Sequence, residues 1–391
     1  MFARPIHPTA TAPTAGSLVM VDLIRFLCAA AVMASHYGTS FWTSPSMGTG
    51  ALLAQVAPPA QELVVSTQFG WLGVELFFVI SGMMIAQSAR GSGAGRFLRR
   101  RVARLVPCAW ICASATAAAT LAIGIGDPDL PGRWLRSVLF WPTGPQIDPS
   151  YWTLGVELSF YLLVAARLRD DAGARLDALA AMLLGWSAAF WTAAVLCGPL
   201  VDGWSLDLRF QLALAPHGCL FALGIVIARA QEGGWTVRRQ YLGAGAFIVC
   251  LAEIASHAAD RAAGYGLDVA PAIPILAFGG GVVLLILAPA LQPAAARWIS
   301  PERARAVGLA TYPLYLIHQD AGAILTVALS RAGLGTSAAL ALSAVVVVAF
   351  AWTVAHWLEP PMRTLLDRAL DRLSSRGPEP DTPRIASPLA G

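Results

Sequence analysis

Eight ionisable side chains stand within long apolar stretches of this sequence, where charges are rare. A charge near the centre of a bilayer costs several kcal/mol and persists only where a partner, water or a ligand offsets it. Histidine and glutamate can exchange protons and arginine can bind phosphate, so this set is the first place to look for chemistry. It comprises Arg25, His36, Glu75, Glu157, His217, Glu253, His318 and Asp320.

Arg25 and His36 belong to one expected helix and are eleven positions apart. At 3.6 residues per turn this spacing places both on one helix face, about 16 Å apart along the axis. The alternative is structural: an arginine whose charged end reaches the interface, and a histidine satisfied within the core. Both interpretations stay open on the spacing alone.

A dense basic segment separates the second and third apolar stretches. Phosphate groups are bound best by arginine, whose planar fork donates paired hydrogen bonds. The alternative role is topological, because basic loops stay on the cytoplasmic side of a membrane. The segment contains Arg96, Arg99, Arg100, Arg101 and Arg104.

The elements that must position these residues are hydrophobic helices. Of the 391 residues 57% are hydrophobic and only 13% charged, and the mean hydropathy is +0.62, which excludes a water-soluble enzyme. We expect an all-α polytopic membrane protein, a bundle of about ten transmembrane helices, each long enough to cross the hydrocarbon core. The expected spans are 17–37, 70–88, 106–125, 150–167, 177–200, 210–228, 241–258, 272–291, 308–330 and 337–358.

The basic residues, all arginine, predict the topology. Those outside the spans alternate from loop to loop, with 21 on one side and 5 on the other, so both termini are expected in the cytoplasm. The net charge of +4 therefore reports topology and predicts no nucleic-acid partner.

One membrane domain is expected, over residues 17–366. Residues 1–16 are expected to form a disordered cytoplasmic lead, and 367–391 a largely disordered cytoplasmic tail. The six cysteines form no CxxC pair and show no metal-binding spacing, so no metal site is predicted.

Several local patterns occur together in a fixed order, and with them the sequence resembles the membrane acyltransferase-3 family of O-acyltransferases. The resemblance covers roughly residues 17–366. The patterns are Arg25 with His36, the segment 73–82, Arg101 and Arg104 before Pro107, the segments 152–161 and 311–318, and Glu359 with Arg363. The four-residue spacing of this last pair also favours an exposed ion pair.

The resemblance implies transfer of an acyl group, usually acetyl, from cytoplasmic acyl-CoA to a hydroxyl group. The expected acceptor is a sugar of an exopolysaccharide, a lipopolysaccharide or a lipid-linked glycan, with an antibiotic-type secondary metabolite as the alternative. Acetyl-CoA is then a substrate, and no permanently bound cofactor is expected. The expected location is the inner membrane of a bacterial cell.

For that chemistry His36 is the candidate general base, because its ordinary pKa near 6.5 suits proton transfer. Glu157 or Glu75 could orient its imidazole, as the third member of a catalytic triad does. The expected donor-binding residues, with packing or purely topological roles as alternatives, are Arg25, Arg100, Arg101, Arg104, Ser81, Tyr312 and His318.

Two other classes of protein stay open. A membrane transporter or flippase could use the same polar residues to conduct a substrate, although the sequence has no internal repeat. A non-catalytic membrane scaffold would not require His36 and Glu157 to lie close together. His217, Glu253 and Asp320 match no motif, and the sequence assigns neither the acceptor hydroxyl nor the oligomeric state.

Overall fold

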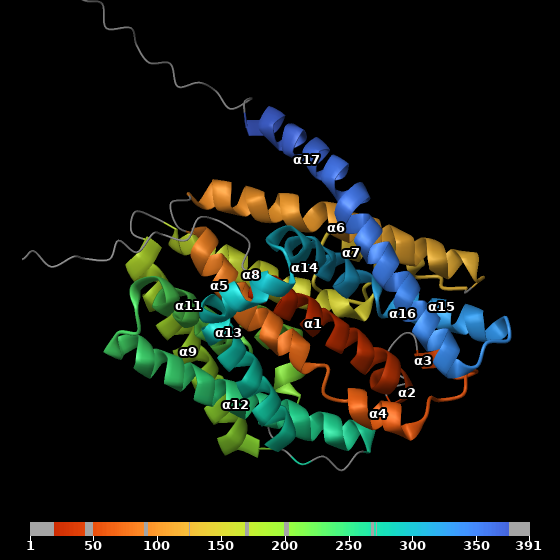
Figure 1. The fold of residues 1–391 in the computed structure, drawn as a ribbon, viewed down its shortest axis with the longest axis horizontal. Coiled ribbons are helices and arrows are strands. Elements are labelled where there is room, and N and C mark those ends of the chain that lie inside the picture. Colours follow the sequence, from red (N-terminus) through yellow and green to blue (C-terminus); the bar gives the residue numbers. More distant parts are fainter. Residues whose placement is uncertain are drawn as a thin grey trace, which may run out of the picture.

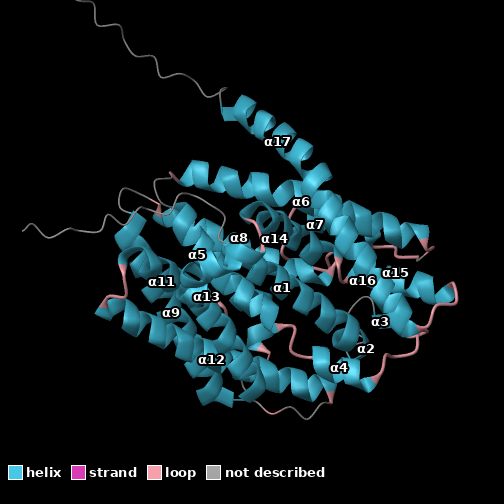
Figure 2. Cartoon of the chain, viewed as in Figure 1, coloured by secondary structure: helices cyan, strands magenta, loops and turns pink. Residues whose placement is uncertain are grey.

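The computed structural model describes residues 19–43, 50–89, 93–124, 126–168, 172–198, 203–266, 270 and 272–374. Every regular element in these ranges is helical, which confirms the all-α prediction (Figures 1 and 2). The long helices are α1 (Val19–Ser35), α5 (Leu72–Ala89), α6 (Ala94–Ala122), α8 (Trp152–Arg167), α9 (Ala172–Cys197), α11 (Gly218–Gly233), α12 (Val237–Tyr265), α13 (Ala272–Trp298), α14 (Pro301–Ile317), α15 (Asp320–Arg331), α16 (Thr336–Thr353) and α17 (Glu359–Ser374).

Shorter elements connect these helices. They are the π-helical turns η1 (His36–Ser40) and η5 (Val354–Leu358), the 3-10 turns η2 (Pro149–Tyr151) and η4 (Trp204–Leu206), and the helices α2 (Phe41–Thr43), α3 (Gly50–Leu53), α4 (Gln61–Thr67), α7 (Leu130–Val138) and α10 (Leu208–Leu212). The expected lead, 1–16, lies outside the described residues.

Within the described ranges, seven continuous helical segments are long and apolar enough to cross a membrane. The expected count of ten stays a prediction, because α8 and α11 have only 16 residues each. The seven segments are Val19–Thr43, Gln61–Ala89, Ala94–Ala122, Arg175–Cys197, Val237–Gly264, Ala272–Trp298 and Thr336–Arg372.

The expected span over 308–330 is not continuous, and this part of the prediction was wrong. Helix α14 ends at Ile317 and α15 begins at Asp320. Groups distant in sequence hold this break: the Asp320 amide donates to Asp148 Oδ2 at 2.9 Å, and the Tyr37 hydroxyl donates to the His318 carbonyl at 3.0 Å. These two bonds satisfy one backbone amide and one backbone carbonyl that a continuous helix would pair internally.

Two expected boundaries also shift. The basic segment is largely helical, because α6 begins at Ala94 and carries the arginines on its first turns. Helix α17 runs to Ser374, so the tail expected from residue 367 is helical over its first eight residues. There Arg99 pairs with Asp371 at 2.5 Å and Asp367 at 3.7 Å, which fastens α17 to α6 (Figure 1).

The centre of the bundle is the close crossing of α5 and α11, whose touching faces carry glycine. A Cβ atom built on Gly224 would lie 2.0 Å from the Val79 carbonyl oxygen, and one on Gly82 2.4 Å from that of Phe221. Small residues let helix backbones approach in this way. The crossing sets the position of α5, which carries Glu75 and Ser81.

We expect Gly224→Ala to destabilise the fold by about 1–3 kcal/mol, because the added methyl meets backbone atoms that cannot rotate away. Gly280→Ala is the matched control, since a Cβ there meets nothing within 4 Å. Denaturation of the detergent-solubilised variants measures the difference. Equal stability of the two variants would contradict this account of the crossing.

Candidate functional site

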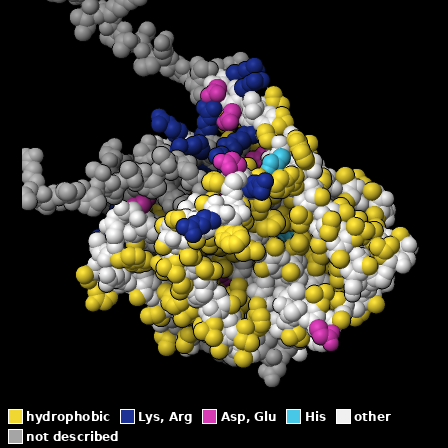
Figure 3. Space-filling model, viewed as in Figure 1, with side chains coloured by type: hydrophobic (Ala, Val, Ile, Leu, Met, Phe, Trp, Pro, Cys, Tyr) yellow, Lys and Arg dark blue, Asp and Glu magenta, His cyan; other side chains and the backbone are white. Residues whose placement is uncertain are grey.

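A basic cavity of about 520 Å³ opens between α1, α5, α6, α14 and α17. We call it the arginine vestibule. Two acidic side chains, Asp22 and Glu359, lie among its arginines, and Asp22 is 3.7 Å from Arg25. Figure 3 shows basic side chains gathered below α17 on a face that is otherwise largely apolar. The arginines that line it are Arg25, Arg100, Arg101, Arg104, Arg305 and Arg363.

The arginines of the basic segment point from two different faces of helix α6. Arg100, Arg101 and Arg104 line the vestibule, whereas Arg99 faces α17. Arg101 is 9% exposed, and its guanidinium lies over the rings of Phe97 and Tyr161, 5.4 and 5.7 Å from their centres. The predicted donor-binding arginines are therefore the ones that share a cavity.

Sequence reasoning missed two further arginines of the vestibule. Arg305 comes from α14, and Arg363 comes from α17, where an exposed ion pair with Glu359 was expected. Both Glu359 and Arg363 instead line the cavity. The four-residue spacing that predicts a surface pair on an isolated helix cannot show that α17 closes over α6.

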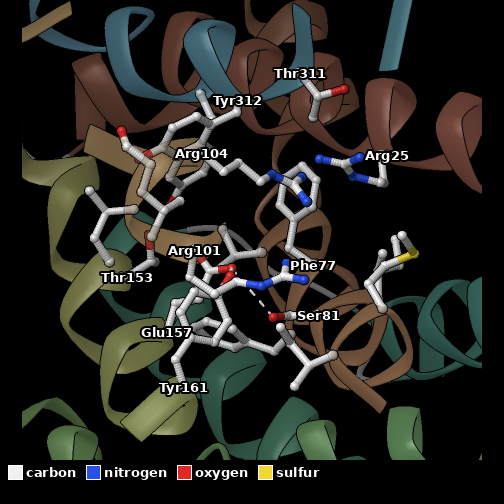
Figure 4. Close-up of a pocket in the computed structure, with 18 residues that line it drawn as sticks. Arg25, Phe77, Ser81, Arg101, Arg104, Thr153, Glu157, Tyr161, Thr311 and Tyr312 are labelled. Carbon is white, nitrogen blue, oxygen red and sulfur yellow. Dashed lines mark hydrogen bonds between the residues drawn. The ribbon is translucent and has the colours of Figure 1, made fainter. Parts of the chain in front are cut away.

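A narrower cavity of about 100 Å³, which we call the inner cavity, adjoins the vestibule and shares Arg25, Arg101, Arg104, Met84 and Tyr312 with it. Figure 4 shows the three guanidinium groups gathered along this cavity, with Glu157 and Ser81 below them. The inner cavity continues to Thr153 on α8 and Tyr315 on α14. The predicted residues Arg25, Ser81, Glu157 and Tyr312 thus line one space.

Glu157 forms the polar wall of the inner cavity. Its Oε1 accepts hydrogen bonds from the Tyr161 hydroxyl and, at 3.4 Å, from the Ser81 hydroxyl (Figure 4). Since Arg101 and Arg104 line the same cavity, this carboxylate faces positive charge and is suited to hold their guanidinium groups in place.

His36 is paired with His318, not with a glutamate. Its Nδ1 lies 2.7 Å from His318 Nε2, and the two rings are within 6° of parallel with centres 4.8 Å apart. Two rings stacked face to face would have their centres about as close as their nearest nitrogens. Here the centres are farther apart than the nitrogens by about two ring radii, so the rings lie edge to edge and nearly in one plane. An N–H···N bond requires this arrangement.

The surroundings of His318 fix the tautomers of both rings. His318 Nδ1 faces the carbonyl oxygens of Tyr315 at 2.9 Å and Leu314 at 3.2 Å, so this nitrogen carries a proton and donates it. In the neutral ring Nε2 then has the lone pair and accepts from His36 Nδ1–H. His36 Nε2 is left with the free lone pair, which is the atom a general base needs.

The predicted pairing of His36 with Glu75 or Glu157 was wrong. Glu157 bonds Ser81 and Tyr161, and Glu75 Oε1 lies 3.1 Å from His257 Nδ1. The break between α14 and α15 places His318 at the end of α1, where it takes the position expected of a carboxylate. His318 was expected among the donor-binding residues. It is instead fully buried and does not line the inner cavity.

Tyr315 links the inner cavity to the histidine pair. Its hydroxyl lies 3.2 Å from the Thr153 hydroxyl at the end of the cavity, and its ring centre lies 5.8 Å from that of His318. The inner cavity thus joins an arginine vestibule that can bind phosphates to the ring of Tyr315, which lies beside the histidine pair. Such an arrangement can hold a phosphorylated donor and deprotonate a hydroxyl group.

Comparisons with known proteins agree with this chemistry. A family model described as "Acyltransferase domain" matches residues 19–357. The chain is also 29% identical over 232 residues to Acyltransferase MdmB of Streptomyces mycarofaciens, and the match covers 52% of this chain. It spans 55% of that relative's length, about half. No solved structure matches significantly.

The family match covers the helices that form the inner cavity and the histidine pair, and those of the vestibule except α17, which begins two residues after the match ends. It favours an acyltransferase over a transporter or a scaffold. The resemblance seen in the sequence motifs is confirmed, and the chain belongs to the acyltransferase-3 family of membrane acyltransferases.

Proposed function

We propose that this protein transfers an acetyl group from acetyl-CoA to a hydroxyl group of a sugar. The acceptor would belong to an exopolysaccharide, a lipopolysaccharide or a lipid-linked glycan. In the reaction His36 Nε2 takes the proton of the acceptor hydroxyl, the oxygen attacks the thioester carbon, and the carbon–sulfur bond breaks. The CoA thiol leaves with a proton, and the acetyl ester stays on the sugar.

The observation that carries this proposal is the order in which the vestibule, the inner cavity and the histidine pair follow one another through the bundle. Several arginines converge on the vestibule, which is the expected site of the CoA phosphates. The narrow inner cavity leads from there toward Tyr315, and suits a thin, flexible arm better than a bulky group. The oriented lone pair of His36 lies beyond Tyr315.

We further propose that the vestibule opens to the cytoplasm of a bacterial cell and that the protein lies in the inner membrane. The arginine-rich ends of α6 and α17 support this orientation, because basic residues keep to the cytoplasmic side. Ten crossings would place both termini there. The histidine pair, at the opposite end of α1 from Asp22, would then face an acceptor on the outer side.

If the vestibule binds CoA phosphates, Arg101→Ala and Arg104→Ala should each weaken acetyl-CoA binding about 10- to 100-fold. This range follows from about 1.5–3 kcal/mol for a hydrogen bond to a charged group. Arg96→Ala is the matched control, because Arg96 lies on the same helix, five positions before Arg101, but lines neither cavity. Binding of acetyl-CoA to the detergent-solubilised variants, measured from low to high salt, gives both affinity and salt dependence.

If all three variants bind acetyl-CoA as tightly as the wild type, the basic segment has only a topological role. The enzymatic proposal has a separate test: solubilised protein should release free CoA from acetyl-CoA when an acceptor sugar is added. Mass spectrometry of surface glycans from cells with and without the protein then identifies the acetylated sugar. No difference in any acetylated glycan would contradict the acceptor class.

A further inference from the structure

A second polar cluster is buried between α5 and α12, apart from the path described above. It consists of Glu75, Glu253 and His257, whose potential ligand atoms all lie within 4.8 Å of one another. Their exposed fractions are 4%, 0% and 9%. On α12 the glutamate and the histidine are four positions apart, which puts both on one helix face.

The hydrogen bonds within the cluster leave part of it unsatisfied. Glu75 Oε1 lies 3.1 Å from His257 Nδ1, but Glu75 Oε2 has no hydrogen-bond partner among the described residues, although it is buried. A buried carboxylate oxygen without a partner loses its hydration with no compensation. Because the carboxylate that carries this oxygen belongs to the cluster, a bound cation could satisfy it.

The groups around Glu253 complete the shell. His217 Nδ1 lies 2.6 Å from Glu253 Oε1, and Cys219 Sγ lies 3.0 Å from Glu253 Oε2. Carboxylates that bind a metal are themselves oriented by hydrogen bonds from surrounding groups, and His217 is placed to give Glu253 such a bond. A nearby thiol adds a further donor suited to zinc.

The charges of the cluster point to a cation. Two carboxylates in close contact inside an apolar bundle repel each other unless protons or a positive ion lie between them. One guanidinium is near: Arg261, one turn beyond His257 on α12, lies 4.8 Å from the centre of the Trp71 ring. A divalent ion bound by two carboxylates and neutral imidazole would be balanced by its own ligands.

We propose that Glu75, Glu253 and His257 bind one Zn²⁺ ion, with His217 orienting Glu253. Oxygen and imidazole ligands are typical of zinc, and bonds of about 2.0–2.1 Å place tetrahedral ligands roughly 3.4 Å apart, so small side-chain movements suffice. The sequence predicted no metal site, because the cysteine spacings gave no sign of one and the ligands come from helices far apart in the chain.

The proposed role of the ion is structural. Helices α5 and α12 both pack against α11, and the ion would cross-link them directly. Glu75 precedes Phe77 and Ser81 on α5, which line the inner cavity. The ion would therefore fix the helix that forms one wall of the inner cavity.

The test is metal analysis of the full-length protein, purified in detergent without chelator, incubated with Zn²⁺ and desalted. We expect about one zinc per chain, and X-ray absorption should show nitrogen and oxygen ligands at about 2.0–2.2 Å. Glu75→Gln, Glu253→Gln and His257→Asn should each lose zinc, and His217→Ala should weaken its binding about 10- to 100-fold. Glu302→Gln and His356→Gln are matched controls outside the cluster and should keep the zinc.

The wild-type measurements do not depend on whether a variant folds. Less than about a tenth of a zinc per wild-type chain after loading would overturn the site, and protonation would then be what removes the repulsion between the carboxylates. Zinc that stays unchanged in all three ligand variants would mark adventitious binding elsewhere and would overturn it as well. Size-exclusion profiles matching the wild type show that a loss of zinc is not a loss of fold.

Discussion

Replacing His36 with glutamine is expected to lower acyl transfer by about 10²–10⁴-fold, the usual contribution of a general base. Glutamine keeps the size of the side chain and can donate to His318 Nε2, but it has no basic nitrogen to accept the acceptor's proton. His36→Ala should be about as inactive. Acetyl-CoA binding should stay within a few-fold of the wild type in both variants, because the proposed donor site is formed by the vestibule arginines and does not include His36.

A purely structural histidine predicts the opposite pattern. In that case His36→Gln stays active because it preserves the hydrogen bond to His318, and His36→Ala folds poorly. Transfer rates at matched protein levels, with donor binding measured in parallel, separate the two roles. Activity of His36→Gln within a few-fold of the wild type would remove His36 from the mechanism and make Glu157, the carboxylate of the inner cavity, the next base to test.

The second large effect is expected at His318, which acts on the reaction only through His36. His318→Leu removes the acceptor for His36 Nδ1–H, so the imidazole can take the other tautomer or rotate. The loss should lie between about 10- and 10³-fold, because it cannot exceed the contribution of the base itself. It should appear in kcat, with little change in the KM for acetyl-CoA.

A conservative substitution of His318 distinguishes a role in orienting His36 from a role in packing alone. In His318→Gln the amide NH₂ can donate to the Tyr315 carbonyl, and the amide oxygen can accept from His36 Nδ1. This variant should recover most of the activity and restore the pH profile of kcat/KM. If His318→Gln is as impaired as His318→Leu while both fold, the tautomer argument is wrong.

The sequence by itself determined the class of the protein and the arginine segment of α6 that lines the vestibule. Hydropathy is a local property of each segment, so a helical membrane bundle follows from composition and length. The α6 arginines were found for the same reason, since their density is visible along the chain. The motifs identified the family because their order and spacing need no knowledge of contacts.

Only the tertiary structure decided which side chains meet. His36 and His318 are 282 positions apart, and Glu75 and His257 are 182 apart, so no local pattern specifies either pair. The first pair depends on a helix break held by Asp148 and Tyr37, groups outside the broken segment. A continuous hydrophobic stretch predicts a continuous helix, because hydropathy contains no information about distant hydrogen-bond partners that satisfy an interrupted backbone.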